Sequence, residues 1–261
     1  MIVVKFGGHA MVDETGNFSQ AIDAAQKTGE TVVVVHGGGP QIDQALVLAG
    51  ITSEFVGGFR VTTPEIFDVV ERVLSKEVGP HLAHTLNSHG IRALSLSGRD
   101  LPTLLSSRKT TLVDGTTADL GLVGDVISVD ISHIVELVTA NVVPVIAPIS
   151  ADIDSENGLN VNADLAAAAI AGALGASALI IMTDVPGIYK SWPDKSSLIV
   201  EISSKELSEM KNTFTQGMAP KVQSALDAIA QGAKAVRIID GTDSDSFAAA
   251  LAGTGGTLVV A

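Results

Sequence analysis

The sequence predicts an α/β fold, in which a largely parallel sheet carries helices on both faces. Apolar runs of four to six residues alternate along the chain with longer segments of helical character. Strands that alternate with helices imply right-handed crossovers and therefore parallel neighbours. Aromatic residues make up only 3% of a chain that is 46% hydrophobic, so the core must be built from Ala, Val, Ile and Leu.

The expected elements follow from this alternation. Seven apolar runs are expected to be strands: 2–6, 31–36, 91–97, 141–148, 178–183, 235–240 and 256–260. The helices are expected between most of them: 18–28, 40–49, 64–89, 131–140, 163–174, 218–231 and 245–252. Residues 98–128 break the alternation, because Thr, Ser, Lys and Gly separate short β-like pieces, and we expect an antiparallel hairpin there. The polar, turn-rich stretch 150–164 is the expected seam between two lobes, 1–164 and 165–261, of one continuous sheet.

Charge and cysteine content exclude several classes of function. The net charge of −13 provides no general positive field, so we expect neither a nucleic acid nor an anionic membrane as a partner. The absence of cysteine excludes disulfides, thiolate nucleophiles and Cys-based zinc sites, and it fits a reducing cytoplasm. The opening MIVVKFGG has a buried-strand pattern rather than that of a signal peptide, and no apolar run reaches membrane-spanning length. We therefore expect a cytoplasmic protein that holds any anionic ligand by local groups.

The stretch VVVVHGGGPQID, residues 32–43, predicts an anion-binding loop. A buried strand runs into three glycines, a proline and helix-forming residues, so backbone N–H groups gather at a helix start. A second pair, Gly7 and Gly8, follows the first strand. No G-x-x-x-x-G-K-[ST] pattern occurs in the chain, so the positive charge for a phosphate must come from elsewhere.

Three basic residues are placed where they could supply that charge. Lys5 lies inside an apolar strand just before the glycine pair, so it either snorkels past the strand edge or faces an anion. Arg60 lies in a turn-rich connection, where a guanidinium could clamp a carboxylate. Lys221 lies in the first turn of the helix expected over 218–231, where a cation is disfavoured unless it is paired with an anion. Asp164 could cap the alanine-rich helix that follows it, or it could hold two lysines in place.

Eight segments in a fixed order resemble the N-acetyl-L-glutamate kinases of the amino-acid kinase superfamily. They are KFGGHAM (5–11), VVHGGGPQI (34–42), GFRVT (58–62), NVNAD (160–164), TDVPGIY (183–189), WPDKSSL (192–198), GMAPK (217–221) and IIDG (238–241). Each glycine loop alone is a weak signal, whereas their order and spacing together are specific. The resemblance covers essentially the whole chain.

The resemblance implies a three-layer αβα sandwich around a mainly parallel, open sheet of about eight strands. It implies that the lobe 1–164 binds the acyl substrate and forms the dimer, and that the lobe 165–261 binds the nucleotide. The implied reaction transfers a phosphoryl group from ATP to the side-chain carboxylate of N-acetyl-L-glutamate, the second step of arginine biosynthesis. Mg²⁺ would be held by the ATP phosphates and water rather than by a metal site of the protein.

The resemblance also assigns roles to residues of this chain. Lys5 and Lys221 would neutralise the transferring phosphoryl group from opposite sides, with Asp164 orienting both. The groups expected to contact the phosphoryl and acyl oxygens are Gly7, Gly8, Gly38 and Gly39. The residues expected to bind the acyl substrate are Arg60, Asn160 and Asn162. The residues expected to bind ATP are Thr183, Asp184, Gly187, Tyr189, Gly217 and Met218.

Alternative functions stay open at this point. A related kinase acts on carrier-bound aminoadipate or glutamate, but its acidic carrier should be repelled by a chain of charge −13 unless a basic patch exists. GFRVT and NVNAD fit the acetylglutamate kinases better than glutamate 5-kinase or carbamate kinase. A catalytically silent regulator that binds amino acids or nucleotides is disfavoured by the presence of both lysines and Asp164.

The start of the chain leads to an expectation about assembly. Family members inhibited by arginine carry an extra helix ahead of the first strand, whereas here the strand 2–6 follows Met1 at once. We therefore expect a homodimer, formed through the lobe 1–164 and its helix 64–89, whose activity is insensitive to arginine.

Overall fold

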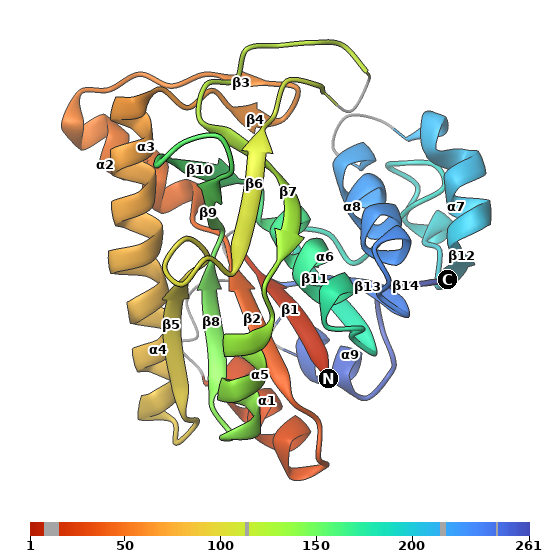
Figure 1. Ribbon diagram of the computed structural model, residues 1–261. Coiled ribbons are helices and arrows are strands. Elements are labelled where there is room, and N and C mark those ends of the chain that lie inside the picture. The colour runs from red at the N-terminus through yellow and green to blue at the C-terminus, as the bar shows by residue number, and fades with distance from the viewer. Residues whose placement is uncertain (8–15, 113–114, 215–217, 244) are drawn as a thin grey trace.

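The computed structural model describes residues 1–7, 16–112, 115–214, 218–243 and 245–261. Within these residues, eight strands form one sheet through the middle of the molecule (Figure 1). In order across the sheet they are β12 (Glu201–Ser203), β14 (Thr257–Val260), β13 (Ala235–Asp240), β11 (Ala178–Thr183), β1 (Ile2–Phe6), β2 (Val32–His36), β8 (Val143–Ala147) and β5 (Ala93–Ser97). Neighbours are parallel except β13 and β14, which pair antiparallel. The predicted mainly parallel sheet is confirmed.

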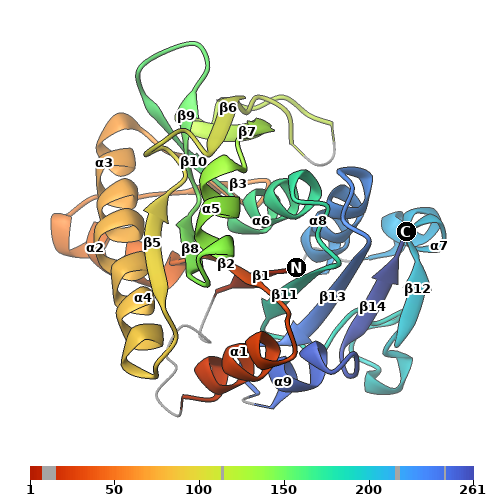
Figure 2. The ribbon, with the colours of Figure 1, turned by 60° about the horizontal axis from the view of Figure 1, so that its bottom comes forward.

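Helices cover both faces of this sheet and make three layers (Figure 2). One face packs against α1 (Asn17–Lys27), α2 (Gly39–Ala49), α3 (Pro64–Arg72), α4 (Gly79–Ser88) and α9 (Ser246–Leu251). The other face packs against α5 (Ser132–Thr139), α6 (Ala163–Ala173), α7 (Ser204–Met210) and α8 (Ala219–Ala230). The strands alternate accordingly, since Val4 faces the first set of helices and Val3 the second. The predicted αβα sandwich is therefore confirmed.

The helix predicted over 64–89 contains an irregularity in its middle. Thr63 caps its start by accepting a hydrogen bond from Ile66 N at 3.3 Å, and Pro64 occupies the first turn. Residues Val73–Val78 are π-helical and connect α3 to α4 without a break in the chain of helical residues. Pro80 has no N–H to give to the carbonyl four residues before it, which accounts for a departure from the α-helical pattern here.

Four further strands of the described chain close into a small barrel. Its order is β10 (Gly158–Val161), β7 (Val123–Val129), β6 (Leu104–Arg108) and β9 (Ile149–Asp152). β6 and β7 pair antiparallel, which confirms the hairpin expected within 98–128. The stretch 150–164 also contains strand residues, whereas the sequence pattern suggested only a turn-rich connection. β9, which begins one residue before this stretch, and β10 are each four residues long and contain polar residues, so neither shows a clear apolar run.

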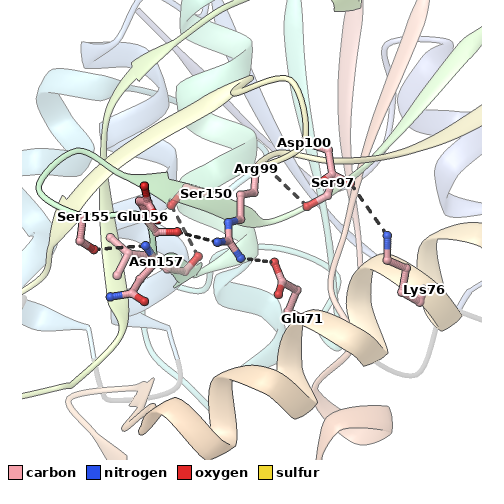
Figure 3. A network of polar contacts seen from close by, with 10 residues as sticks. Glu71, Lys76, Ser97, Arg99, Asp100, Ser150, Ser155, Glu156 and Asn157 are labelled. Carbon is pink, nitrogen blue, oxygen red and sulfur yellow. Dashed lines mark hydrogen bonds and ion pairs between the residues drawn. The ribbon is translucent and has the colours of Figure 1, made fainter.

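A polar network ties the barrel to the long helix (Figure 3). Arg99 donates from Nη1 to Glu71 Oε1 at 2.8 Å and from Nη2 to the carbonyl of Glu156 at 2.7 Å. Glu71 lies on α3, and Glu156 lies in the turn between β9 and β10. Gly158 leaves the necessary room, because a Cβ there would lie 3.0 Å from Arg99 Nη1. Arg99 thus fixes the β9–β10 hairpin against α3.

The sequence pattern did not reveal several short elements. They are the hairpin β3 (Phe55–Val56) and β4 (Phe59–Arg60), the strand β12, the helix α7 and the 3₁₀ turns Lys195–Ser197 and Lys211–Thr213. The start of α7 had a usable signal. Ser203 and Glu206 form a capping box, the S-x-x-E pattern that marks a helix N-terminus.

Candidate active site

Three segments meet at the edge of the sheet formed by the carboxyl ends of the central strands. They are the end of β1, the loop after β2 and the start of α6. The N–H of Gly37 donates to Phe6 O at 2.8 Å, which ties the loop after β2 to the end of β1. A Cβ on Gly37 would lie 4.0 Å from the Cβ of Ala163, so the start of α6 reaches the same place. Ligands of open α/β sheets bind at this edge, and the N-termini of α2 and α6 both lie here.

Lys5 and Asp164 form an ion pair at this edge. Lys5 Nζ lies 3.0 Å from Asp164 Oδ1, and the two side chains are 15% and 20% exposed. The contact lies outside hydrogen-bond geometry, because the buried Oδ1 has no hydrogen-bond partner among the described residues. Gly7 lets the lysine fold toward the site, since a Cβ at this position would come 3.0 Å from Nζ. Among the described residues no hydrogen bond uses the hydrogens of Lys5 Nζ, so Lys5 could donate them to a ligand.

Lys221 lies on a different carboxylate from the one predicted. Its Nζ donates to Asp184 Oδ1 at 2.9 Å, across from the first turn of α8 to the loop after β11. This hydrogen bond is the main reason that the pKa of Asp184 lies below its usual value, and the charge of Lys5 lowers it further. The two lysines therefore converge on one region from opposite halves of the sheet. Here Lys5 pairs with Asp164 and Lys221 pairs with Asp184, and the orientation of both lysines by Asp164 stays a prediction.

Asn162 caps the N-terminus of α6. Its Oδ1 accepts hydrogen bonds from Asp164 N at 2.9 Å and Leu165 N at 3.2 Å. Because Asn162 is the N-cap, the carboxylate of Asp164 is not needed for capping and can pair with Lys5. Asn160, on β10, donates from Nδ2 to Thr62 Oγ1 at 3.2 Å.

The guanidinium of Arg60 is already engaged within the chain. Nη2 lies 2.6 Å from Asp43 Oδ1, and Nη1 donates to Ser53 Oγ at 2.6 Å. The guanidinium carbon also lies 4.6 Å from the centre of the Phe55 ring. The Arg60 side chain is 6% exposed, whereas that of Asp43 is 59% exposed. A carboxylate ligand could reach this fork only by taking the place of Asp43.

The two described glycines of the α2 start differ in their surroundings. A Cβ on Gly38 would lie 2.5 Å from Cδ2 of Leu74 in the π-helical segment, so a side chain there would require Leu74 to move. At Gly39 no described atom lies within 4 Å of the Cβ position, so this backbone faces open space. Gly8, also expected to contact a ligand, lies outside the described residues.

Buried side chains and a local hydrogen bond support the loop after β11. Thr183 Oγ1 accepts a hydrogen bond from Val185 N at 3.1 Å. A Cβ on Gly187 would collide with Thr257. Tyr189 is buried with its ring 5.2 Å from that of Trp192, and Met218 is buried at the start of α8. These side chains shape the loop, in which Asp184 and Pro186 are exposed. Gly217 lies outside the described residues.

A cavity of about 510 Å³ opens beside the Lys5–Asp164 pair. Asn162 and Asp164 line it from the start of α6, and the barrel and α8 supply the charged side chains Lys109, Asp125 and Asp227. Burial raises the pKa of Asp227. Within the described ranges, His, Cys, Asp and Glu side chains form no group of three that could hold a metal ion. None of the helices described is long and apolar enough to cross a membrane.

Comparison with known families agrees with this geometry. Residues 1–240 match the amino acid kinase family. The chain belongs to that family. Among curated relatives, the acetylglutamate kinase of Arthrobacter sp. (strain FB24) is 49% identical over 247 residues, covering 92% of this chain and 80% of the relative. The acetylglutamate kinase of Corynebacterium glutamicum (strain ATCC 13032) is 42% identical over 258 residues, covering 98% and 87%.

Solved structures show the same amino acid kinase fold. The smu.665 protein of Streptococcus mutans UA159 superposes with a TM-score of 0.81 at 29% identity, covering 99% of this chain and 98% of that one. The N-acetylglutamate synthase of Neisseria gonorrhoeae, solved with coenzyme A and N-acetyl-glutamate, gives a TM-score of 0.83 at 22% identity, covering all of this chain and 59% of that one. At that identity the second likeness concerns the fold alone.

Proposed function

We propose that this chain is an acetylglutamate kinase. It transfers the γ-phosphoryl group of ATP to the side-chain carboxylate of N-acetyl-L-glutamate, giving N-acetyl-L-glutamyl 5-phosphate and ADP, the second step of arginine biosynthesis. The observation that carries the proposal is the convergence of Lys5 and Lys221, each beside a carboxylate, at the carboxyl edge of the sheet. Relatives that carry this name are 42–49% identical over nearly the whole chain.

The reaction requires the protein mainly to align the two substrates and to supply positive charge. A glutamate side chain with a pKa of about 4.3 is already ionised at neutral pH, so the nucleophile needs no general base. The acceptor carboxylate and the γ-phosphate repel each other, and the ammonium groups of Lys5 and Lys221 offset that repulsion. Because phosphoryl transfer depends mainly on alignment and neutralisation of oxygens, fixed lysines are the groups it requires. Asp164 and Asp184 hold them in place.

The glycine loops supply the remaining contacts in this proposal. Gly7 and Gly8 after β1, and Gly38 and Gly39 at the start of α2, present N–H groups to the phosphoryl and acyl oxygens. Support comes from the open space at Gly39 and from the bond that fixes Gly37 to β1.

Arg60, Asn160 and Asn162 bind the acyl substrate in this proposal. For Arg60 the substrate carboxylate takes the place of Asp43, an exchange of one carboxylate for another on the same guanidinium fork. Asn160 lies beside Thr62, two residues from Arg60 along the chain, which supports a shared substrate subsite.

The nucleotide lies against the C-terminal half of the sheet in this proposal. The lobe 165–261 would bind ATP through the loop that follows β11, with residues Thr183, Asp184, Gly187 and Tyr189, and through Gly217 and Met218 before α8. Mg²⁺, when it arrives with ATP, supplies further neutralisation of the phosphate oxygens. Its ligands would be phosphates and water, and Asp184 is a largely exposed carboxylate of the loop assigned to ATP.

A homodimer formed through the lobe 1–164 is also part of the proposal. β5 is an edge strand of the sheet, and its Leu94 is 44% exposed. Open sheet edges with apolar side chains invite pairing with another chain. The neighbouring α4 lies beside β5 (Figure 1) and carries the exposed residues His81 and His84, which could contact a second copy. Light scattering at micromolar concentration would give twice the mass of 26.7 kDa for a dimer and that mass itself for a monomer.

An ADP-release assay with several acceptors tests the activity. N-acetyl-L-glutamate, L-glutamate and carbamate are compared side by side at equal concentration, with ATP and Mg²⁺. We expect release of ADP with N-acetyl-L-glutamate and only background release with the other two. Preference for free glutamate or carbamate would point to the related kinases, and no release with any acceptor would favour a silent regulator or a carrier-bound substrate.

A further inference from the structure

His36 closes β2 immediately before the glycine loop and is fully buried. We propose that His36 is a positioning residue: its Nδ1–H donates to the carbonyl of Gly37 and so holds the glycine loop in the orientation that binds ligand. The inference rests on the proposed function only in the identity of that ligand. The hydrogen bond itself is a property of the chain without substrate.

The geometry assigns the tautomer of the imidazole. Nδ1 lies 2.8 Å from the oxygen of Gly37, and a carbonyl oxygen can only accept. The hydrogen must therefore sit on Nδ1. Burial lowers the pKa of His36 to about 4, so the ring is neutral at physiological pH and Nε2 is a bare acceptor.

The hydrogen bond from His36 orients a whole peptide unit and not only the carbonyl of Gly37, because a peptide unit is planar. The carbonyl of Gly37 and the N–H of Gly38 belong to the same unit and point in opposite directions. Fixing the carbonyl toward His36 therefore turns the N–H of Gly38 away from the core. Gly37 N donates to Phe6 O at 2.8 Å, and Gly38 O accepts from Ile42 N at 2.9 Å. His36 completes this set and leaves three consecutive peptide units with restricted orientation.

The far side of the ring is held by the long helix. Nε2 has no hydrogen-bond partner among the described residues, so packing alone fixes this edge. A Cβ on Gly79 would lie 2.9 Å from Nε2 and 2.5 Å from Ser95 Oγ. Gly79 begins α4, directly after the π-helical segment, and its N–H donates to Leu74 O. A glycine at this point of the helix is what gives the imidazole its space.

Three substitutions at position 36 separate the hydrogen bond from the packing. His36→Asn keeps an N–H donor at the position of Nδ1, His36→Gln moves the donor further out, and His36→Leu removes it. We expect kcat/KM for the acyl substrate to fall about tenfold in His36→Leu and His36→Gln, the factor that corresponds to one lost hydrogen bond. His36→Asn should stay within about twofold of the unchanged protein.

Val34→Ala is the matched control, because Val34 is buried on the same strand and faces the same layer of helices. It should lower the melting temperature as the leucine variant does, but leave kcat/KM unchanged. Equal kcat/KM values for His36→Leu and Val34→Ala would overturn the proposal.

A measurement without substrate tests the hydrogen bond directly. Long-range ¹H–¹⁵N NMR spectra of the ¹⁵N-histidine-labelled protein report which ring nitrogen carries hydrogen, and His36→Asn assigns the signal among the six histidines. We expect the Nδ1–H tautomer, and the Nε2–H tautomer or an imidazolium at neutral pH would refute the proposal. If N-acetyl-L-glutamate proves not to be a substrate, the proposed function fails while this spectrum still decides the role of His36.

Discussion

In the proposed function, Lys5 and Lys221 supply the positive charge that the loop Gly37–Gly39 lacks in its own sequence. They come from the first strand and from α8, and their Nζ atoms lie 3.0 Å and 2.9 Å from separate carboxylates. The placement of Lys5 could be anticipated, since a lysine in an apolar strand before glycines has few other uses. The partner Asp184 could not, because it is 37 residues from Lys221 and no local pattern joins them.

Removing the Lys221 side chain should separate catalysis from stability. Lys221→Ala should lower kcat by about 10²–10³-fold, because a fixed charge beside the transferring group is lost. The free energy of unfolding should change by less than about 1 kcal/mol, because Asp184 is largely exposed. Lys205→Ala, at an exposed position of α7, is the control and should leave both quantities unchanged. Unaltered turnover in Lys221→Ala would contradict the role given to it.

Replacing the guanidinium of Arg60 with an ammonium group should change the KM for one substrate more than the KM for the other. Arg60→Lys keeps the charge but cannot hold both Ser53 and an incoming carboxylate, so the KM for N-acetyl-L-glutamate should rise about tenfold. The KM for ATP should stay near its original value, and the same should hold for both substrates in the exposed control Arg92→Lys. A selective rise in the KM for ATP would show that the two lobes have been assigned the wrong way round.

Among the secondary-structure elements, apolar strands were predictable and polar ones were not. The runs IVVKF and ALIIMT predict β1 and β11, because buried parallel strands need apolar side chains on both faces. β9 and β10 escaped prediction because ISAD and GLNV contain polar residues within four-residue strands. Their place in the barrel depends on contacts with β6 and β7, which lie far away in the sequence. The same barrel positions Asn160, so this part of the site could be named only by resemblance.

The β9–β10 hairpin should loosen when its link to α3 is removed. Arg99→Met keeps much of the side-chain volume but loses the bonds to Glu71 and to the carbonyl of Glu156. We expect the free energy of unfolding, from urea titration, to fall by about 1–2 kcal/mol. Arg72→Met is the matched control, because its pair with Glu77 is about half exposed and should contribute less than ~0.5 kcal/mol. Equal losses in the two variants would show that Arg99 makes an ordinary surface contact.

In the whole molecule, one sheet joins the two sets of loops that the proposed function assigns to the acyl substrate and to ATP. β1 and β11 are neighbours at its centre, so Lys5 from the first half and Asp184 from the second lie on adjacent strand ends. The family resemblance and the alternation of strands and helices were enough to predict this architecture. They could not predict the ion pair between Arg60 and Asp43. This pair depends on a short hairpin, whose strands β3 and β4 are only two residues long each.

The stability of the whole chain should depend on pH through His36. The folded pKa of about 4 lies below the ordinary 6.5, so between these values the unfolded chain binds a proton that the folded chain does not. Stability is therefore fully present above pH 6.5 and falls as pH decreases toward 4, by up to about 3 kcal/mol. Urea titrations at several pH values would show this slope reduced in His36→Asn. His84→Asn, at an exposed position, should keep the slope, and an equal slope in all three proteins would contradict buried neutral His36.

The proposed reaction forms an acyl phosphate on N-acetyl-L-glutamate. Hydroxylamine converts an acyl phosphate into a hydroxamate with release of phosphate, so it traps the product and distinguishes phosphoryl transfer from plain ATP hydrolysis. The measurement is the amount of N-acetylglutamyl hydroxamate formed per ADP released, with ATP, Mg²⁺ and hydroxylamine present. We expect equal amounts of the two, both reduced about 10²–10³-fold in Lys221→Ala. Release of ADP without hydroxamate would contradict it.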